Sequence, residues 1–226
     1  MARSSLTRVL SPTERRELDP HLSPLAWAAG DPLVFAGDVP GGVHLLMSGR
    51  VRVTRDTAEG HEITVDIAGP GDVIGPLDTT PRTAVDSAWA METTCSLFLR
   101  AESLAEIVSR FPALALSLLR LQEERLAQAR EREVARTTGT VEQRVAAALL
   151  ALAEKFGRDR PDGSVLLEVR LRRDDIAGLA STTVESASRA MARMKREGWI
   201  DSGREWVSLI DAPALSALQQ PAEPGR

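Results

Sequence analysis

Short runs of alternating hydrophobic and polar residues fill the first part of the chain. The alternation is clearest at residues 51–54 and 63–67, and glycines recur between the runs at 37, 49, 60, 69, 71 and 75. A period of two indicates strands with one buried face, and glycine marks the turns between them. The segment from about 25 to 100 is therefore predicted to be a small all-β barrel or roll.

The apolar spacing becomes helical after residue 100. Helices are predicted at 102–109 and from Pro112 to about Arg136, because proline suits a first turn and neither glycine nor proline interrupts the second run. Leucines at 114, 118, 119, 121 and 126 make this second helix apolar on more than one face. A second copy of the helix would cover such a surface, and packing on the chain's own barrel is the alternative.

Helical and strand patterns alternate beyond a predicted hinge at 137–140. Helices followed by a two-stranded wing make a winged helix-turn-helix, and this order predicts one. The elements are an amphipathic helix over 141–157, a strand over 165–171, two short helices over 172–180 and 182–198, and a hairpin over 199–210 that turns at Ser202 and Gly203.

Charge is distributed unevenly along the chain. The formal net charge is −4, yet residues 170–196 hold seven basic residues against three acidic ones. This asymmetry predicts that one small region meets a polyanion while the rest of the surface does not. An ordinary solvated face is the alternative.

A polar stripe lies on the second helix of the predicted pair. Glu185, Ser188 and Arg189 share one side of it, and a helix-turn-helix places this helix in the DNA major groove. Arginine can bind guanine through two hydrogen bonds, glutamate can accept from cytosine, and serine suits either kind of base. The predicted phosphate contacts, which position the protein without reading sequence, are Arg172, Arg173, Thr183, Arg193, Lys195 and Arg196.

Two motifs resemble the cAMP receptor protein/FNR (CRP/FNR) superfamily of bacterial transcription regulators. GGVHLLMSGRVRV followed by GPGDVIG resembles the family's β-roll, and DDIAGLASTTVESASR resembles its helix-turn-helix. The resemblance implies an α+β fold with a cyclic-nucleotide-binding-like β-roll sensory domain at 1–110, a dimerisation helix at 111–137 and a winged helix-turn-helix at 138–226. It also implies double-stranded DNA, a second copy of the chain and RNA polymerase as partners.

The recognition helix resembles the FNR-like form of this family. FNR-like members carry Val-Glu-x-x-Ser-Arg, and this chain has Val184, Glu185, Ser188 and Arg189 in that spacing. Val184 cannot read guanine but can touch a thymine methyl group. We therefore expect inverted TTGA half-sites, centred about one helical turn (~34 Å) apart. Arg172 stands where many members have a Thr or Ser helix cap.

The effector pocket that the resemblance implies is degenerate. Cyclic nucleotide binders of the family use Gly-Glu-Leu for the ribose and an Arg before Ser-Ala for the phosphate. This chain has Pro76 in place of the Glu and Asp86 in place of the Arg, and Asp86 would repel a phosphate. A displaced motif at Arg82 is the alternative. The predicted pocket residues are Gly75, Pro76, Leu77, Arg82, Asp86, Ser87, Ala129 and Arg130.

Other effectors and chemistries have little support in the sequence. One cysteine excludes a four-cysteine iron–sulfur cluster within one chain. His44 is predicted to pack in a strand, His61 to be exposed, and Cys95 to be a buried small residue. Trp27 and Trp89 are predicted core residues. No cofactor, metal site or enzymatic activity is predicted, because no nucleophile–base pair or ligand spacing is visible.

The sequence also predicts a cytoplasmic protein without a membrane span. The single cysteine fits a reducing compartment, and no stretch approaches the ~18 apolar residues of a spanning helix. The favoured function is a dimeric transcription regulator that needs no effector or senses an unknown one. The alternative is a sensor that acts through a protein partner, with weak or vestigial DNA binding.

Overall fold

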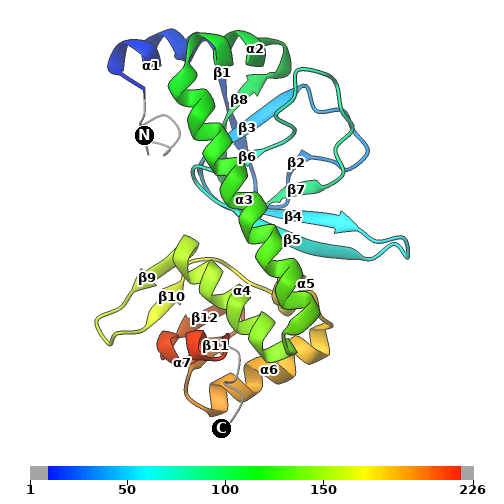
Figure 1. Ribbon diagram of the computed structural model, residues 1–226, viewed down its shortest axis with the longest axis vertical. Helices are drawn as coiled ribbons and strands as arrows, with labels where there is room; N and C mark the ends of the chain where they lie inside the picture. The colour runs from blue at the N-terminus through cyan, green and yellow to red at the C-terminus, as the bar shows by residue number, and fades with distance from the viewer. Residues whose placement is uncertain (1–9, 220–226) are drawn as a thin grey trace. The chain divides into compact units, whose positions relative to one another are not determined.

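The computed structural model describes residues 10–219, which fall into two compact units divided after Ala127. In the first unit, two four-stranded antiparallel sheets form the β-roll, with strand orders β1-β8-β3-β6 and β2-β7-β4-β5 (Figure 1). The strands are β1 (Leu22–Trp27), β2 (Pro32–Val34), β3 (Gly42–Ser48), β4 (Val51–Asp56), β5 (Glu62–Ala68), β6 (Val73–Ile74), β7 (Ser87–Ala90) and β8 (Thr94–Arg100).

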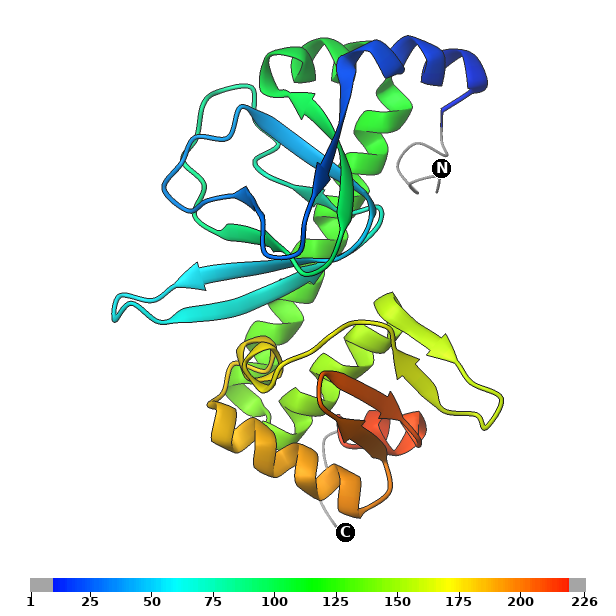
Figure 2. The same cartoon turned by 180° about the vertical axis from the view of Figure 1, so that it is seen from behind.

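The predicted β-roll is therefore confirmed, and its core lies between the two sheets. Leu46 and Val51 are fully buried there with Ala68 and Ala88. The β4–β5 hairpin continues past this core and projects from the roll (Figure 2). The short N-terminal helix α1 (Pro12–Leu18) was not predicted from the sequence. Ser11 caps this helix, because its hydroxyl accepts from the Glu14 amide.

Two helices follow the roll, α2 (Ala101–Arg110) and α3 (Pro112–Thr138). One face of α3 carries Leu114, Leu118 and Leu121, which pack on the core of the first unit. By helical periodicity Leu116, Leu119, Leu126 and Val134 share a different face, and each is 51 to 65% exposed.

The predicted hinge is shorter than the sequence suggested. Thr137 and Thr138 still belong to α3, and their hydroxyls donate to the carbonyls of Glu133 and Val134 one turn earlier. The helix breaks at Gly139, and the next helix begins after Thr140, whose hydroxyl accepts from the Gln143 amide at 3.3 Å.

The second unit contains the helix-turn-helix and a four-stranded sheet of order β11-β12-β10-β9 (Figure 1). Its core is built from Val145 and Leu149 of the first helix, Met191 and Met194 of the third helix, and Leu209 of the sheet. The elements are α4 (Val141–Phe156), β9 (Gly157–Asp159), β10 (Val165–Leu167), α5 (Arg173–Leu179), α6 (Val184–Arg196), β11 (Ile200–Gly203), β12 (Trp206–Leu209) and α7 (Ala212–Ala217).

Three details of the second unit correct the sequence prediction. The predicted strand at 165–171 ends at Leu167, and β9 and α7 were not predicted. The hairpin turns at Arg204 and Glu205 rather than at Ser202 and Gly203, which are paired with β12. The sequence placed the turn at the glycine, but here the left-handed backbone position is Glu205, with φ of +61°.

Candidate nucleic-acid interface

Helix α6 separates its residues into a buried face and an open face. Ala187, Met191 and Met194 are at most 1% exposed, as the apolar spacing predicted. On the other side Glu185 and Arg189 are open, with side chains 87% and 73% exposed. The helix thus packs against its unit while leaving its polar side chains accessible.

The start of α6 is fixed by its own side chains. The Thr183 hydroxyl caps the helix by accepting from the Ser186 amide at 3.2 Å, and it also donates to the Ser186 hydroxyl at 3.0 Å. The tight turn before it includes Ser181, whose φ of +48° is left-handed. The N-terminal residues of α6 are therefore presented in a defined orientation.

The predicted base-reading residues lie together at this end of α6. Val184 is 41% exposed, Ser188 is half-buried, and an Arg189 guanidinium nitrogen lies 4.0 Å from the Glu185 carboxylate. Sequence reasoning missed Ser186, whose hydroxyl accepts from Arg189 at 2.9 Å. The i to i+3 spacing of the two residues was the available signal.

The predicted phosphate contacts do not form one uniform set. Arg196 is exposed, and Arg172 is exposed at the start of α5. Arg193 forms an ion pair with Glu142 of α4 at 2.9 Å. Arg173 is half-buried against Met191 and donates to the Ser202 hydroxyl at 3.5 Å.

Lys195 links α6 to the β11–β12 hairpin. Its ammonium donates to the Ser202 carbonyl at 2.8 Å and lies 2.7 Å from the Asp201 carboxylate. The hydrogen bond from Lys195 lowers the pKa of the Asp201 carboxyl. Lys195 and Arg193 thus occupy opposite edges of the open face, one beside the hairpin and one beside α4.

Helix α5 begins without the hydroxyl cap that many family members have. The carboxylate of Asp175 instead accepts from the Arg172 amide at 2.8 Å, and Asp175 is completely buried. This bond satisfies one of the backbone N–H groups that a helix start leaves open. The departure at Arg172 therefore does not move the start of α5.

The residues of the predicted effector pocket do not converge on one site. Asp86 binds the Arg55 guanidinium through two hydrogen bonds, of 2.7 and 3.1 Å. The hydrogen bond to Asp86 raises the pKa of Arg55. Ser87 accepts from the Ala36 amide, and Arg82 lies 3.5 Å from Asp78. The partner Arg55 was not anticipated from the sequence.

The remaining predicted pocket residues have separate surroundings. Gly75 has φ of +102°, a conformation that favours glycine, and Pro76 follows it. Leu77 alone lines a cavity, described below. Ala129 and Arg130 are exposed on α3 and belong to the second compact unit.

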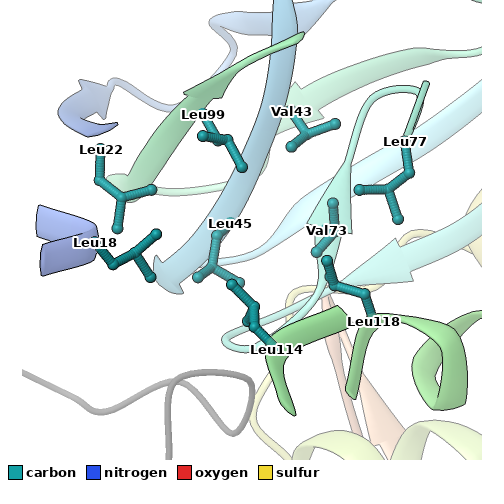
Figure 3. A pocket seen from close by; sticks show the side chains of 9 residues that line it. All are labelled: Leu18, Leu22, Val43, Leu45, Val73, Leu77, Leu99, Leu114 and Leu118. Carbon is teal, nitrogen blue, oxygen red and sulfur yellow. The ribbon is translucent and has the colours of Figure 1, made fainter. Parts of the chain in front are cut away.

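A small apolar cavity lies in the first unit (Figure 3). Its volume is about 40 Å³, and only leucine and valine side chains line it. A water molecule in this cavity would have no side-chain hydrogen-bond partner, because every lining side chain is apolar. The lining residues are Leu18, Leu22, Val43, Leu45, Val73, Leu77, Leu99, Leu114 and Leu118.

The isolated histidine and cysteine residues have contrasting environments. His44 is buried as predicted, edge-on to Trp27 at 5.5 Å, and this burial lowers its pKa to about 4. His61 is exposed, also as predicted. Cys95 is exposed, so the prediction of a buried residue was wrong. Trp27 and Trp89 were predicted to be core residues, but both are only half-buried.

The environment of Cys95 follows from the strand it occupies. In β8 the inward positions are taken by Thr94 and Ser96, which are 0% and 1% exposed. The buried Ser96 hydroxyl accepts a hydrogen bond from Trp27 Nε1 at 3.2 Å, so this polar group has a partner in the interior. Because successive strand residues face opposite ways, Cys95 faces outward.

Two negative findings concern the residues from Leu10 to Gln219. This part of the chain contains no cluster of three or more His, Cys, Asp or Glu side chains placed to hold a metal ion. None of its helices combines the length and hydrophobicity that crossing a membrane requires.

Family models match both parts of the chain. A model described as a cyclic nucleotide-binding domain matches residues 24–111, and one described as a Crp-like helix-turn-helix domain matches residues 143–218. The first match covers the β-roll with α2, and the second covers α4 to α7 almost completely.

Characterised relatives align over most of the chain. The "Cyclic AMP receptor protein" of Thermus thermophilus is 31% identical over 84% of this chain and 84% of its own length. The "CRP-like cAMP-activated global transcriptional regulator" of Mycobacterium tuberculosis is 28% identical over 96% of each chain. Among solved structures, a CooA mutant from Carboxydothermus hydrogenoformans has a TM-score of 0.76 at 22% identity, covering 97% of both chains.

Proposed function

The chain belongs to the CRP/FNR superfamily of transcription regulators, and we propose that it is a homodimer that reads an inverted TTGA-like repeat in double-stranded DNA without needing cAMP. The observation that carries the proposal is the open polar face of α6, which holds Glu185 and Arg189 on a helix buried by its other side. Arg189 would bind guanine, Glu185 a cytosine amino group, and Val184 a thymine methyl group.

Phosphate binding would use the basic residues around this face. Arg196 is open for it. Arg172 lies 3.9 Å from the Asp175 carboxylate, and Arg193 and Lys195 would exchange the carboxylates of Glu142 and Asp201 for phosphates. Arg173 would have to leave Met191 and Ser202 to reach a phosphate, and the Thr183 hydroxyl would have to leave Ser186. We therefore expect Arg172 and Arg196 to contribute more to the salt dependence of binding than Arg173 does.

Dimerisation is proposed to use the exposed face of α3. Leu116, Leu119 and Leu126 recur at helical spacing, are more than half exposed, and lie away from the face that packs on the first unit. Burying such side chains between two copies is favourable. Leu119→Glu combined with Leu126→Glu should yield a monomer in analytical ultracentrifugation, and an unchanged dimer would place the interface elsewhere.

The proposed division of labour follows the family. Residues 1–110 would be a sensory domain, 111–137 the dimerisation helix and 138–226 the DNA-binding domain, with RNA polymerase as the protein partner. The paired Asp86 and the absence of a carboxylate at Pro76 support the view that cAMP is not the effector.

The decisive experiment is fluorescence anisotropy of the purified protein on a TTGA–N–TCAA palindrome and on a scrambled duplex, at two salt concentrations. We expect preference for the palindrome without added effector. Equal binding to both duplexes would contradict the proposed half-site, and no binding to either would favour the alternative of a sensor that acts through a protein partner. Random-sequence selection with cell extract would then separate a missing effector from a wrong half-site.

A further inference from the structure

Two of the three basic residues predicted to bind phosphate on α6 are held by carboxylates from other elements. Arg193 pairs with Glu142 of α4 at 2.9 Å, and Lys195 pairs with Asp201 of β11 at 2.7 Å. In the part of the chain that the structure describes, no carboxylate pairs with the exposed Arg196, the residue that follows Lys195. The pairing is therefore specific to two of the three positions.

Glu142 is less exposed than the arginine it binds. It lies in the first turn of α4, where the helix dipole favours a negative charge. Its side chain is 31% exposed, against 54% for Arg193. A phosphate that approached the Arg193 guanidinium would meet the charge of Glu142 beside it, so the two anions would compete for one cation.

Lys195 has a second, uncharged partner. Its ammonium donates to the Ser202 carbonyl at 2.8 Å in addition to its contact with the Asp201 carboxylate. The hydrogen bond from Lys195 lowers the pKa of Asp201, so this carboxyl is ionised at neutral pH. Both side chains of the ion pair are about half exposed. Removing the charge of Asp201 would leave the bond to Ser202 in place.

Carboxylates and phosphates offer a cation the same group, an anionic oxygen that accepts charge-assisted hydrogen bonds. A phosphate contact adds affinity because the cation neutralises a phosphate and releases the counterions around it. A cation that already has an anionic partner in the free protein must weaken that contact first. The net gain on binding DNA is therefore smaller for Arg193 and Lys195 than for an unpaired cation.

We propose that Glu142 and Asp201 are intramolecular competitors of DNA, which occupy Arg193 and Lys195 in the free protein and thereby lower the affinity for every duplex. This inference rests on the proposed function. Because phosphate contacts carry no sequence information, the competition acts equally on palindromic and unrelated DNA. The two carboxylates set how tightly the protein binds, and the residues at the start of α6 set which sequence it prefers.

The test measures anisotropy of single-charge variants on the palindromic and scrambled duplexes. Glu142→Gln and Asp201→Asn each remove one negative charge and keep the shape of the side chain. Glu168→Gln is the matched control, because its carboxylate also pairs with an arginine, Arg158 of β9 at 3.0 Å, apart from α6 (Figures 1 and 2). The control measures the general gain from lowering the negative charge of the protein. Circular dichroism and thermal unfolding establish that each variant is folded.

We expect Glu142→Gln to tighten binding to both duplexes by the same factor, roughly two- to five-fold beyond the control, the range that an exposed ion pair is worth. Asp201→Asn should tighten binding by less, because the Ser202 carbonyl still holds Lys195. In the Arg193→Gln background, Glu142→Gln should have only the effect of the control. Raising the salt concentration should reduce each gain, because salt screens exposed pairs.

Three results would overturn the inference. The first is affinity in Glu142→Gln and Asp201→Asn equal to that of Glu168→Gln. The second is a gain from Glu142→Gln that persists in full in the Arg193→Gln background, since the carboxylate would then repel DNA directly. The third is a gain confined to one duplex. If the wild type binds both duplexes equally, the proposed half-site fails, while the gains over the control still decide the competition; binding of no duplex by any variant would contradict both.

Discussion

The open face of α6 and the 75–88 segment of the β-roll both carry charged side chains, and they differ in where those charges find partners. Glu185 and Arg189 are exposed on α6. The Arg189 guanidinium lies 4.0 Å from the Glu185 carboxylate and donates to the Ser186 hydroxyl, and both are surface contacts that a base can replace. Asp86 in the roll is bound through two hydrogen bonds to Arg55. A polar residue that the chain already satisfies is a poor ligand site, whereas an ordered but weakly partnered one is suited to recognition.

The largest effect we expect lies in the β-roll that holds the 75–88 segment, at the buried His44 of β3. Burial lowers the pKa of His44 to about 4 in the folded protein, against 6.5 for a solvated histidine, so the unfolded chain binds the proton first as pH falls. The contribution of His44 to the stability of the first unit should be constant above about pH 6.5. It should fall by ~3 kcal/mol in total as the pH decreases from 6.5 to 4. Urea unfolding at several pH values measures this.

His44→Gln should remove that pH dependence, and His61→Gln, at an exposed histidine, should leave it intact. An identical loss of stability in His44→Gln on acidification would show that other groups cause it. The expectation concerns stability alone and not a sensing role.

On the open side of the comparison, Arg189→Ala should weaken binding to the palindrome by roughly 1 to 3 kcal/mol and relax the preference at the guanine. Anisotropy on the palindrome and on single-base variants of it measures both quantities. A uniform loss on every sequence would mean that Arg189 contacts phosphate.

Val184→Arg should change which sequence is preferred more than how tightly the protein binds. The new guanidinium can bind a guanine that valine cannot, so preference should shift towards a TGTGA-like half-site. Selection from random duplexes compares the variant with the wild type. An unchanged consensus would show that Val184 does not face a base.

The smallest effects are expected at the Arg55–Asp86 pair. Arg55→Ala should cost under about 1 kcal/mol of stability, because exposed ion pairs contribute little. Isothermal titration of cAMP into the wild type and into Asp86→Ala should show no binding to either. Tight binding of cAMP to the wild type would contradict the conclusion that the 75–88 segment is a poor ligand site.

Much of the fold could be predicted because it depends on local patterns. The burial of Ala187, Met191 and Met194 could be predicted from their helical spacing alone. The break at Gly139 could be predicted because glycine and threonines interrupt the helical pattern at 137–140. Cys95 was misplaced because the inward residues beside it, Thr94 and Ser96, are small and polar, so the apolar pattern indicated the wrong face.

The candidate site was harder to predict from the sequence where it depends on residues that are distant along the chain. The four base-reading candidates and their exposure follow from one helix and its period. The partner of Asp86 is 31 residues away at Arg55, and no periodicity relates the two.

One bond network ties α3 to a turn of the β-roll. Arg125 donates to the Val73 carbonyl at 2.9 Å and to the Asp72 carboxylate at 3.1 Å, and the other oxygen of Asp72 accepts from the Gly69 amide at 2.7 Å. These bonds fix the turn to α3 on the side of Arg125. The turn at residues 69–73 could move only by breaking these bonds or by moving Arg125 with it, on the helix that also carries the exposed leucines.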